Sequence, residues 1–212
     1  MNFLPLMPMK NSLTALVLGL FMWTTATAQD AVSAFTKELA AKSTAIESIC
    51  CRFEQVRSMQ LLKEDVRQEG DFYYLRPDRI LLSFDNKDYI CMTQTHFQLQ
   101  TAGVKQRVKL QSNPMLRELN RILSAAMQGD VESLAAGFIP TVRDEGDRFE
   151  VELRPAKGRM AARVQSITMH FERATMSLTL LRMAETSGDA TTYRFFRKRF
   201  NEKIDSQIFN RE

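Results

Sequence analysis

Large apolar side chains recur at every second position between residues 49 and 84, and this alternation constrains the fold more than any other feature of the chain. A period of two is typical of β-strands that bury one face. Phe72, Tyr74 and Arg76 share one face of the second strand in this region. A charge on such a face is costly unless it is paired. The pattern therefore predicts an apolar sheet face with one paired arginine at its end.

Two helical regions interrupt the predicted strands. Val32, Phe35 and Leu39 recur at helical spacing after Asp30, which predicts an amphipathic helix from 30 to about 42. An apolar stripe between 113 and 138 predicts a second helix, broken at 129–130 and continued by a shorter one. Strands are expected at roughly 49–59, 66–76, 79–85, 88–94, 95–102, 139–144, 148–154, 164–172, 176–186 and 191–200, with a short one near 204–209.

These elements predict an α+β fold class. A sheet of about ten strands tends to curl. If it curls without closing, its concave face must be covered by the helices. We therefore expect an incomplete, strongly curved antiparallel β-barrel with helices forming a lid over an apolar cavity.

The first 28 residues have the pattern of a signal peptide. Lys10 precedes an apolar run that is short for a membrane span, and a small-x-small pattern ends at Ala28. We expect cleavage before Gln29, which leaves a single exported domain at 29–212. We expect that domain to be periplasmic and monomeric.

Charge and motifs exclude several classes of function. The predicted signal peptide holds one of the 29 basic residues and none of the 25 acidic ones, so the exported chain carries about +3, too little to indicate nucleic-acid binding. No nucleophile elbow, phosphate-binding glycine loop or metal-ligand spacing is present. The sequence therefore predicts neither an enzyme nor a cofactor. The basic and aromatic segment 193–200 is interpreted as a strand with exposed basic residues.

The three cysteines allow at most one intramolecular disulfide. Cys51 shares the face of Phe53, and Cys50 points to the other face. Two arrangements stay open: a bridge from Cys50 or Cys51 to Cys91, or buried free thiols.

The first strands resemble the periplasmic outer-membrane lipoprotein carrier family (LolA-like). Its pattern is a Phe-x-Gln strand, here at 53–55, then a Gly-x-aromatic strand that ends in Arg-Pro, here at 70–77, and an apolar strand, here at 80–84. Further matches follow in the family's order at 153–155, 167–171, 188, 200–205 and 209. The chain departs from the family where the usual hairpin after the third strand is replaced by 89–97 and where Ile80 and Leu82 replace aromatic residues.

The resemblance implies a ligand-binding cavity under a helical lid that an arginine latches. Arg76 occupies the latch position, where bonds to helix carbonyls or lid side chains would set how readily cargo enters and leaves. The shared parity of adjacent strands predicts which side chains line the cavity. From the sheet these are Phe53, Phe72, Tyr74, Ile80, Leu82 and Phe84, and from the helices Leu39, Met115, Leu119 and Ile122.

The function expected from this resemblance is carriage of acyl lipids. Each buried methylene contributes about 0.8 kcal/mol, so an acylated anchor needs a carrier to cross an aqueous compartment. We expect acylated lipoproteins or related lipids as cargo, an inner-membrane donor complex and an outer-membrane acceptor as partners, and no nucleic acid. The alternative is a lipid-sensing or interaction domain with the same half-barrel that does not shuttle cargo.

Overall fold

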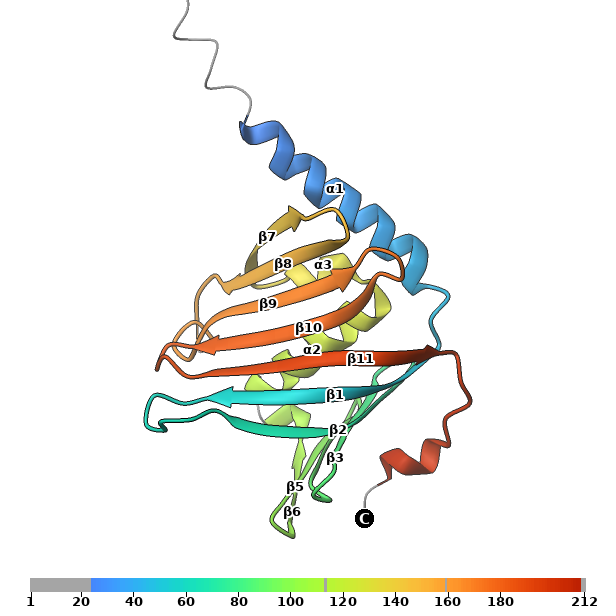
Figure 1. Cartoon of the computed structure of the whole chain (residues 1–212), viewed down its shortest axis with the longest axis vertical. Coiled ribbons are helices and arrows are strands. Elements are labelled where there is room, and N and C mark those ends of the chain that lie inside the picture. Colours follow the sequence, from blue (N-terminus) through green and yellow to red (C-terminus); the bar gives the residue numbers. More distant parts are fainter. Residues whose placement is uncertain (1–23, 113, 159, 211–212) are drawn as a thin grey trace, which may run out of the picture.

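The computed structural model describes residues 24–112, 114–158 and 160–210. An eleven-stranded antiparallel sheet forms its framework, and the sheet does not close, because β6 and β7 lie at opposite edges (Figure 1). The predicted α+β half-barrel is confirmed. No helix in these residues is long and apolar enough to cross a membrane.

The first half of the chain supplies one helix and six strands. These are α1 (Thr24–Ser43), β1 (Ser48–Ser58), β2 (Val66–Leu75), β3 (Arg79–Phe84), β4 (Tyr89–Met92), β5 (His96–Thr101) and β6 (Val104–Lys109). The 3₁₀ helix η1 (Leu110–Ser112) then leads to α2 (Pro114–Gln128) and α3 (Val131–Ala135). The second half supplies β7 (Phe138–Asp144), β8 (Arg148–Pro155), β9 (Val164–Glu172), β10 (Ser177–Glu185), β11 (Ala190–Phe200) and the 3₁₀ helix η2 (Ser206–Phe209).

Each half of the sheet is a meander, and the two meanders meet where β1 pairs with β11. In this pairing Phe53 lies opposite Phe195, and Gln55 lies opposite Tyr193. The order across the sheet is β6-β5-β4-β3-β2-β1-β11-β10-β9-β8-β7. The sheet is therefore continuous although its central pair joins opposite ends of the chain.

The helices pack on one face of this sheet, and the main core lies between them (Figure 1). Phe35 of α1 meets Phe149 and Phe171 edge-on, with ring centroids 5.6 and 5.2 Å apart. At the end of α1, the Lys42 ammonium donates a hydrogen bond to the carbonyl of Arg173 at 2.7 Å. These contacts fix α1 across the β7–β9 end of the sheet.

Two glycines are required by close packing. A Cβ at Gly70 in β2 would lie 2.2 Å from the carbonyl oxygen of Ser83 on the adjacent strand. Gly129, between α2 and α3, has a φ of +72°, and a Cβ there would lie 1.8 Å from Oγ of Ser43 at the end of α1. Gly129 therefore lets the end of α2 approach the end of α1.

The opposite, outer face carries a second small hydrophobic cluster. Leu81, Tyr89, Cys91 and Phe209 form it, so η2 packs against β3 and β4. All three cysteines are buried free thiols, which decides between the two arrangements left open by the sequence.

The predicted elements differ from the observed ones at three places. The segment near 204–209 is the 3₁₀ helix η2 rather than a strand, because the Asp205 carboxylate accepts a hydrogen bond from the Gln207 amide and caps it. Strand β6 was not predicted, since its exposed residues show no apolar alternation. Helix α1 begins at Thr24, earlier than the expected 30. Residues 1–23 of the predicted signal peptide lie outside the described residues.

Candidate functional site

A cavity of about 280 Å³ lies between the inner face of the sheet and α2. Both meanders contribute to it, because the β1–β11 pair runs through its wall. Its lining residues are Gln55, Arg57, Phe72, Leu82, Ile90, Met92, Phe97, Leu116, Leu123, Leu181, Met183, Thr191, Tyr193 and Phe195.

The strand register makes this wall apolar. Phe72 lies opposite Leu82, Leu82 opposite Ile90, and Met92 opposite Phe97. Because side chains alternate between the faces of a strand, each pair projects to the same side. The inner faces of β2 to β5 therefore form one continuous apolar surface.

Aromatic pairs stiffen the centre of the wall. Phe72 meets Phe195 edge-on across the β1 strand that separates their own strands, with ring centroids 5.0 Å apart. Phe195 stacks with Tyr193 at 6.4 Å, and Phe53 meets Phe84 at 5.1 Å. Offset and edge-on contacts of this kind add stability beyond area burial alone. We infer a rigid floor under the cavity.

One side of the cavity is polar. Gln55 donates a hydrogen bond from Nε2 to the Tyr193 hydroxyl at 2.6 Å, and the exposed Arg57 lies next to them. Burial raises the pKa of Tyr193, an effect that the Gln55 hydrogen bond opposes. Tyr193 is therefore an uncharged hydroxyl at neutral pH. The cavity combines an apolar interior with one cationic side chain at its edge.

Helix α2 covers the cavity with a mixed surface. Its buried residues include the apolar Ile122 and Leu123, and Leu123 lines the cavity. Asn120 and Ser124, one turn apart, are also buried, and neither Asn120 Oδ1 nor Ser124 Oγ has a hydrogen-bond partner within the described residues. Unpaired buried polar atoms destabilise the packed state. The packing of α2 on the sheet is therefore less stable than an apolar helix would make it.

Arg76 binds the end of α1. Its Nη2 donates to the carbonyl of Ser43 at 2.8 Å, and its Nε donates to the carbonyl of Ile46 at 3.1 Å. Its guanidinium also lies 3.7 Å from the Glu47 carboxylate. The sequence pointed to helix carbonyls or lid side chains, and the carbonyl it reaches on a helix is the last one of α1. Arg76 is not among the residues that line the cavity.

Helix α2 is joined to the sheet beside Arg76. The Gln128 side chain, at the last residue of α2, donates a hydrogen bond from Nε2 to the carbonyl of Pro77. The Tyr74 hydroxyl donates to the same carbonyl at 3.3 Å, and burial raises the pKa of Tyr74 to about 12. The turn after β2 therefore holds both helices, α1 through Arg76 and α2 through Pro77.

The residues predicted from the sequence fall into three groups. Phe72 and Leu82 line the cavity. The side chains of Met115 and Leu119 lie outside the described part of the structure. The others, apart from Arg76, are buried in the core around the cavity without lining it, namely Leu39, Phe53, Tyr74, Ile80, Phe84 and Ile122.

Sequence analysis missed the lining residues from β4, β5, β10 and β11. Their period-two alternation was present, as in Leu181 and Met183 or Thr191, Tyr193 and Phe195. That alternation shows which residues share a face, but the β1–β11 pairing is needed to place them beside β2 and β3.

The family model described as outer membrane lipoprotein carrier protein LolA matches residues 44–212. A search of curated proteins found no match. Among solved structures, a LolA superfamily protein from Nitrosomonas europaea is similar at 10% identity and a TM-score of 0.43, covering 86% of this chain and 97% of that chain.

Two further structures are similar to this chain. A DUF1329 family protein from Desulfovibrio piger has 10% identity and a TM-score of 0.47 over 84% of this chain and 97% of its own. The MucA/MucB complex of Pseudomonas aeruginosa matches at 12% identity with a TM-score of 0.46, covering 85% of this chain and 60% of that one.

Proposed function

This chain belongs to the LolA family of outer membrane lipoprotein carrier proteins, and we propose that it is a periplasmic carrier of acyl chains. Its cargo is an acylated lipoprotein or a related lipid, received from an inner-membrane donor complex and delivered to an outer-membrane acceptor. Residues 1–28 are the signal peptide, and 29–212 form the carrier domain. Cleavage before Gln29 removes the first residues of α1 and keeps the part that packs on the sheet. The domain works as a monomer, without a cofactor and without catalysis.

The observation that carries this proposal is the apolar cavity under α2. Its volume of about 280 Å³ lies just below the range for small-molecule sites, roughly 300–1,000 Å³. A multiply acylated anchor is larger than such a site. Cargo therefore enters only when α2 moves away from the sheet, and the closed cavity is the resting form.

The polar atoms buried on α2 support a lid of this kind. A carrier must release its cargo, so its lid must exchange readily between closed and open positions. Asn120 and Ser124 lower the stability of the closed position, and Gln128 restores part of it at the end of the helix. Arg76 holds α1 and the turn that receives Gln128 in one arrangement. In this proposal Arg76 positions the receiving end of the lid.

Two variants with the same new side chain test the cavity. Thr191 lines the cavity and Thr192 faces the opposite side of β11. Thr191→Trp fills the cavity and is expected to abolish saturable binding of a fluorescent fatty acid. Thr192→Trp is the matched control and is expected to bind like the wild type.

Transfer of a lipoprotein between two membranes distinguishes a carrier from a lipid-sensing domain. The wild type is expected to remove a labelled lipoprotein from inner-membrane vesicles and pass it to acceptor vesicles, and mass spectrometry of protein from its native source is expected to find acylated cargo. Binding without transfer would favour the lipid-sensing alternative. Absence of both cargo and saturable binding would overturn the proposal.

A further inference from the structure

A second pocket, of about 390 Å³, lies on the outer face of the sheet, away from the cavity under α2. The strand register defines this face, because Leu81 lies opposite Cys91, Cys91 opposite Gln98, and Gln98 opposite Arg107. Leu81 and Cys91 belong to the outer cluster under η2. Gln98 and Arg107 extend the same row beyond η2, and there the pocket opens.

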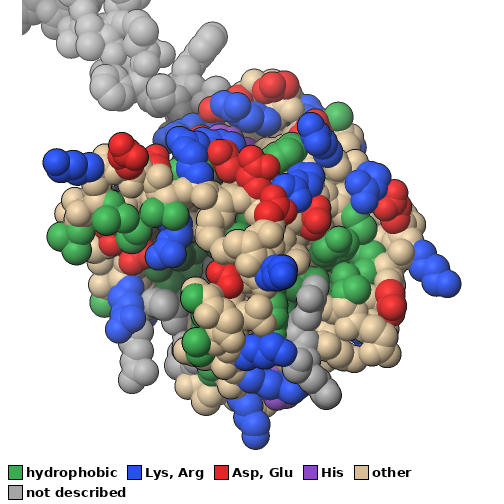
Figure 2. Space-filling model, turned by 60° about the horizontal axis from the view of Figure 1, so that its bottom comes forward, with side chains coloured by type: hydrophobic (Ala, Val, Ile, Leu, Met, Phe, Trp, Pro, Cys, Tyr) green, Lys and Arg blue, Asp and Glu red, His purple; other side chains and the backbone are tan. Residues whose placement is uncertain are grey.

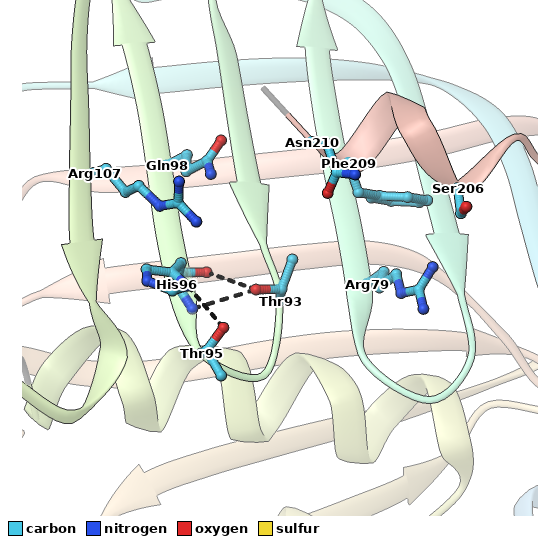
Figure 3. A pocket seen from close by; sticks show the side chains of 9 residues that line it. All are labelled: Arg79, Thr93, Thr95, His96, Gln98, Arg107, Ser206, Phe209 and Asn210. Carbon is cyan, nitrogen blue, oxygen red and sulfur yellow. Dashed lines mark hydrogen bonds between the residues drawn. The ribbon is translucent and has the colours of Figure 1, made fainter. Parts of the chain in front are cut away.

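The pocket gathers cationic and hydrogen-bonding groups. Figure 3 shows Arg107, Gln98 and His96 on the neighbouring strands β6 and β5, with Arg79 on the far side beside Phe209 of η2. Arg79 and Arg107 stand on strands three spacings apart, or about 14 Å. Among the residues that the structure describes, no carboxylate lines it.

In the part of the chain that the structure describes, Arg107 has no acidic partner, whereas Arg79 interacts electrostatically with the neighbouring Asp78. In the segments that the structure describes, the guanidinium groups of Arg79 and Arg107 form no hydrogen bond and no close salt bridge. The Asp78 carboxylate accepts a hydrogen bond from Gln94 and also interacts with the charge of Arg79, but it accepts no hydrogen bond from that guanidinium. Both guanidinium groups therefore keep their hydrogen-bond donors for a ligand.

Figure 2 shows how Lys and Arg side chains lie between hydrophobic patches on the underside of the molecule.

Gln98 provides independent evidence for a ligand. It is 7% exposed, lines the pocket, and its Oε1 has no hydrogen-bond partner in the described residues. A buried polar atom without a partner is uncommon in a folded protein. An amide oxygen accepts hydrogen bonds and does not donate them. The missing partner is therefore a donor such as a hydroxyl group.

We propose that this outer pocket binds a phosphate ester that also carries hydroxyl groups, of the glycerol phosphate type. The paired donors of an arginine guanidinium match the geometry of phosphate oxygens. His96 of β5 adds a ring nitrogen to these groups. The Thr95 hydroxyl holds Nδ1 of His96 at 2.7 Å, which leaves Nε2 for the ligand. A hydroxyl of the same ligand donates to Gln98 Oε1.

The volume favours this class over a free inorganic anion. A pocket of about 390 Å³ lies within the range for small organic ligands and exceeds what a single phosphate fills. The same chemistry occurs in free glycerol phosphate and in the headgroup of phosphatidylglycerol. The site is separate from the acyl-chain cavity, so it does not depend on the proposed carrier function.

Calorimetric titration with sn-glycerol 3-phosphate at pH 7.5 tests the pocket in the exported chain. Arg107→Gln is expected to weaken binding about tenfold, in line with the loss of a charge-assisted contact, and Arg79→Gln is expected to weaken it as well. Arg117→Gln, an exposed arginine of α2 on the other side of the sheet, removes the same charge and is the control. Equal losses in all three variants, or no saturable binding, would overturn the proposal.

The role of Gln98 has its own test. Gln98→Met removes the acceptor and keeps the size of the side chain. It is expected to weaken the binding of glycerol 3-phosphate. The binding of methyl phosphate, which has no free hydroxyl group on its alkyl part, is expected to stay unchanged. Equal effects on the two probes would contradict the assignment of Oε1 to a ligand hydroxyl.

Vesicles distinguish the source of the phosphate ester. Binding to phosphatidylglycerol vesicles that free glycerol 3-phosphate competes away, and that Arg107→Gln weakens, identifies a lipid headgroup. Binding of the free ester without binding to vesicles identifies a soluble ligand. Binding to vesicles that is equal in the wild type and in Arg107→Gln would exclude the pocket as a headgroup site.

Discussion

The guanidinium of Arg76 donates a hydrogen bond to the carbonyl of Ser43, 2.8 Å away, and so joins the end of β2 to the last residue of α1. The carbonyls at a helix C-terminus have no partner within the helix, and a cation there also interacts favourably with the helix dipole. The next residue, Pro77, receives Gln128 at the end of α2. Arg76 and Pro77 therefore join the ends of α1 and α2 to the same turn after β2.

Arg76→Leu is expected to lower the free energy of unfolding by about 1–3 kcal/mol, because two charge-assisted hydrogen bonds to backbone carbonyls are lost. The fold is expected to persist, and lipoprotein transfer is expected to slow while lipid binding remains. Chemical denaturation and the vesicle transfer assay measure the two effects. Arg76→Lys keeps the positive charge but lacks the paired donors of the guanidinium. Its stability and its transfer rate are therefore expected to lie between those of the wild type and those of Arg76→Leu. Normal stability and normal transfer in Arg76→Leu would show that Arg76 has neither role.

Ser124→Ala is expected to stabilise the protein by about 1 kcal/mol, because it removes a buried hydroxyl that has no partner in the described residues. Part of this gain would come from the higher helix propensity of alanine. Ser33→Ala, at an exposed position of α1, measures that part alone. A more stable closed lid should also slow the uptake of a fluorescent fatty acid in stopped-flow experiments. Equal stability changes in the two variants would remove the argument for a weakened lid.

The three thiols are expected to react slowly with Ellman's reagent at pH 8 in the native protein and completely after denaturation without reductant. Burial raises the pKa of Cys51 to about 12, so almost none of it is thiolate at pH 8. Burial also raises the pKa of Cys50. Recovery of one thiol instead of three after denaturation would reveal a disulfide and contradict the free thiols of the structure.

Asp85 is expected to contribute stability that depends on pH. Its carboxylate accepts two hydrogen bonds from Arg52, at 2.8 and 3.0 Å, and these lower the pKa of Asp85. A carboxylate with a lowered folded pKa stabilises the protein above its unfolded pKa, near 4, and loses this effect as the pH falls through the folded value. Because the pair is exposed, Asp85→Asn should cost less than about 1 kcal/mol at pH 7.

The comparison of wild type and Asp85→Asn by urea denaturation should show this difference shrinking toward zero as the pH falls through the lowered pKa of Asp85. Asp65→Asn is the control, since its carboxylate lies 3.9 Å from Arg67 and is expected to contribute less at pH 7. A difference that stays constant with pH would mean that Asp85 acts through packing.

Local patterns predicted most of the strands, because alternation and turns are properties of short segments. Strand β9 was predicted at 164–172, where the structure has it. Strand β6 was missed because an edge strand that buries neither face needs no apolar alternation. A short strand was predicted near 204–209, but the Asp205 cap and the packing of Phe209 against the outer face favour η2.

The cavity was harder to predict than the fold. The inner faces of β2 and β3 were assigned from parity alone, and Phe72 and Leu82 lie in the cavity wall. Tyr193 and Phe195 could not be placed beside them, because their position depends on a pairing between strands more than a hundred residues apart. Whether Arg76 binds α1 or α2 depends on how the helices pack, and no spacing in the sequence encodes that.

The pairing of β1 with β11 has a consequence for the order in which the molecule can form. Each meander consists of neighbouring segments and can assemble from local contacts. The β1–β11 pairing, in contrast, can form only after the last strand is present. Pairings between distant segments are the slow steps of folding. During synthesis the first meander is complete long before β11, and its apolar inner face is then exposed to water. The cavity therefore cannot be complete until nearly the whole chain has been synthesised.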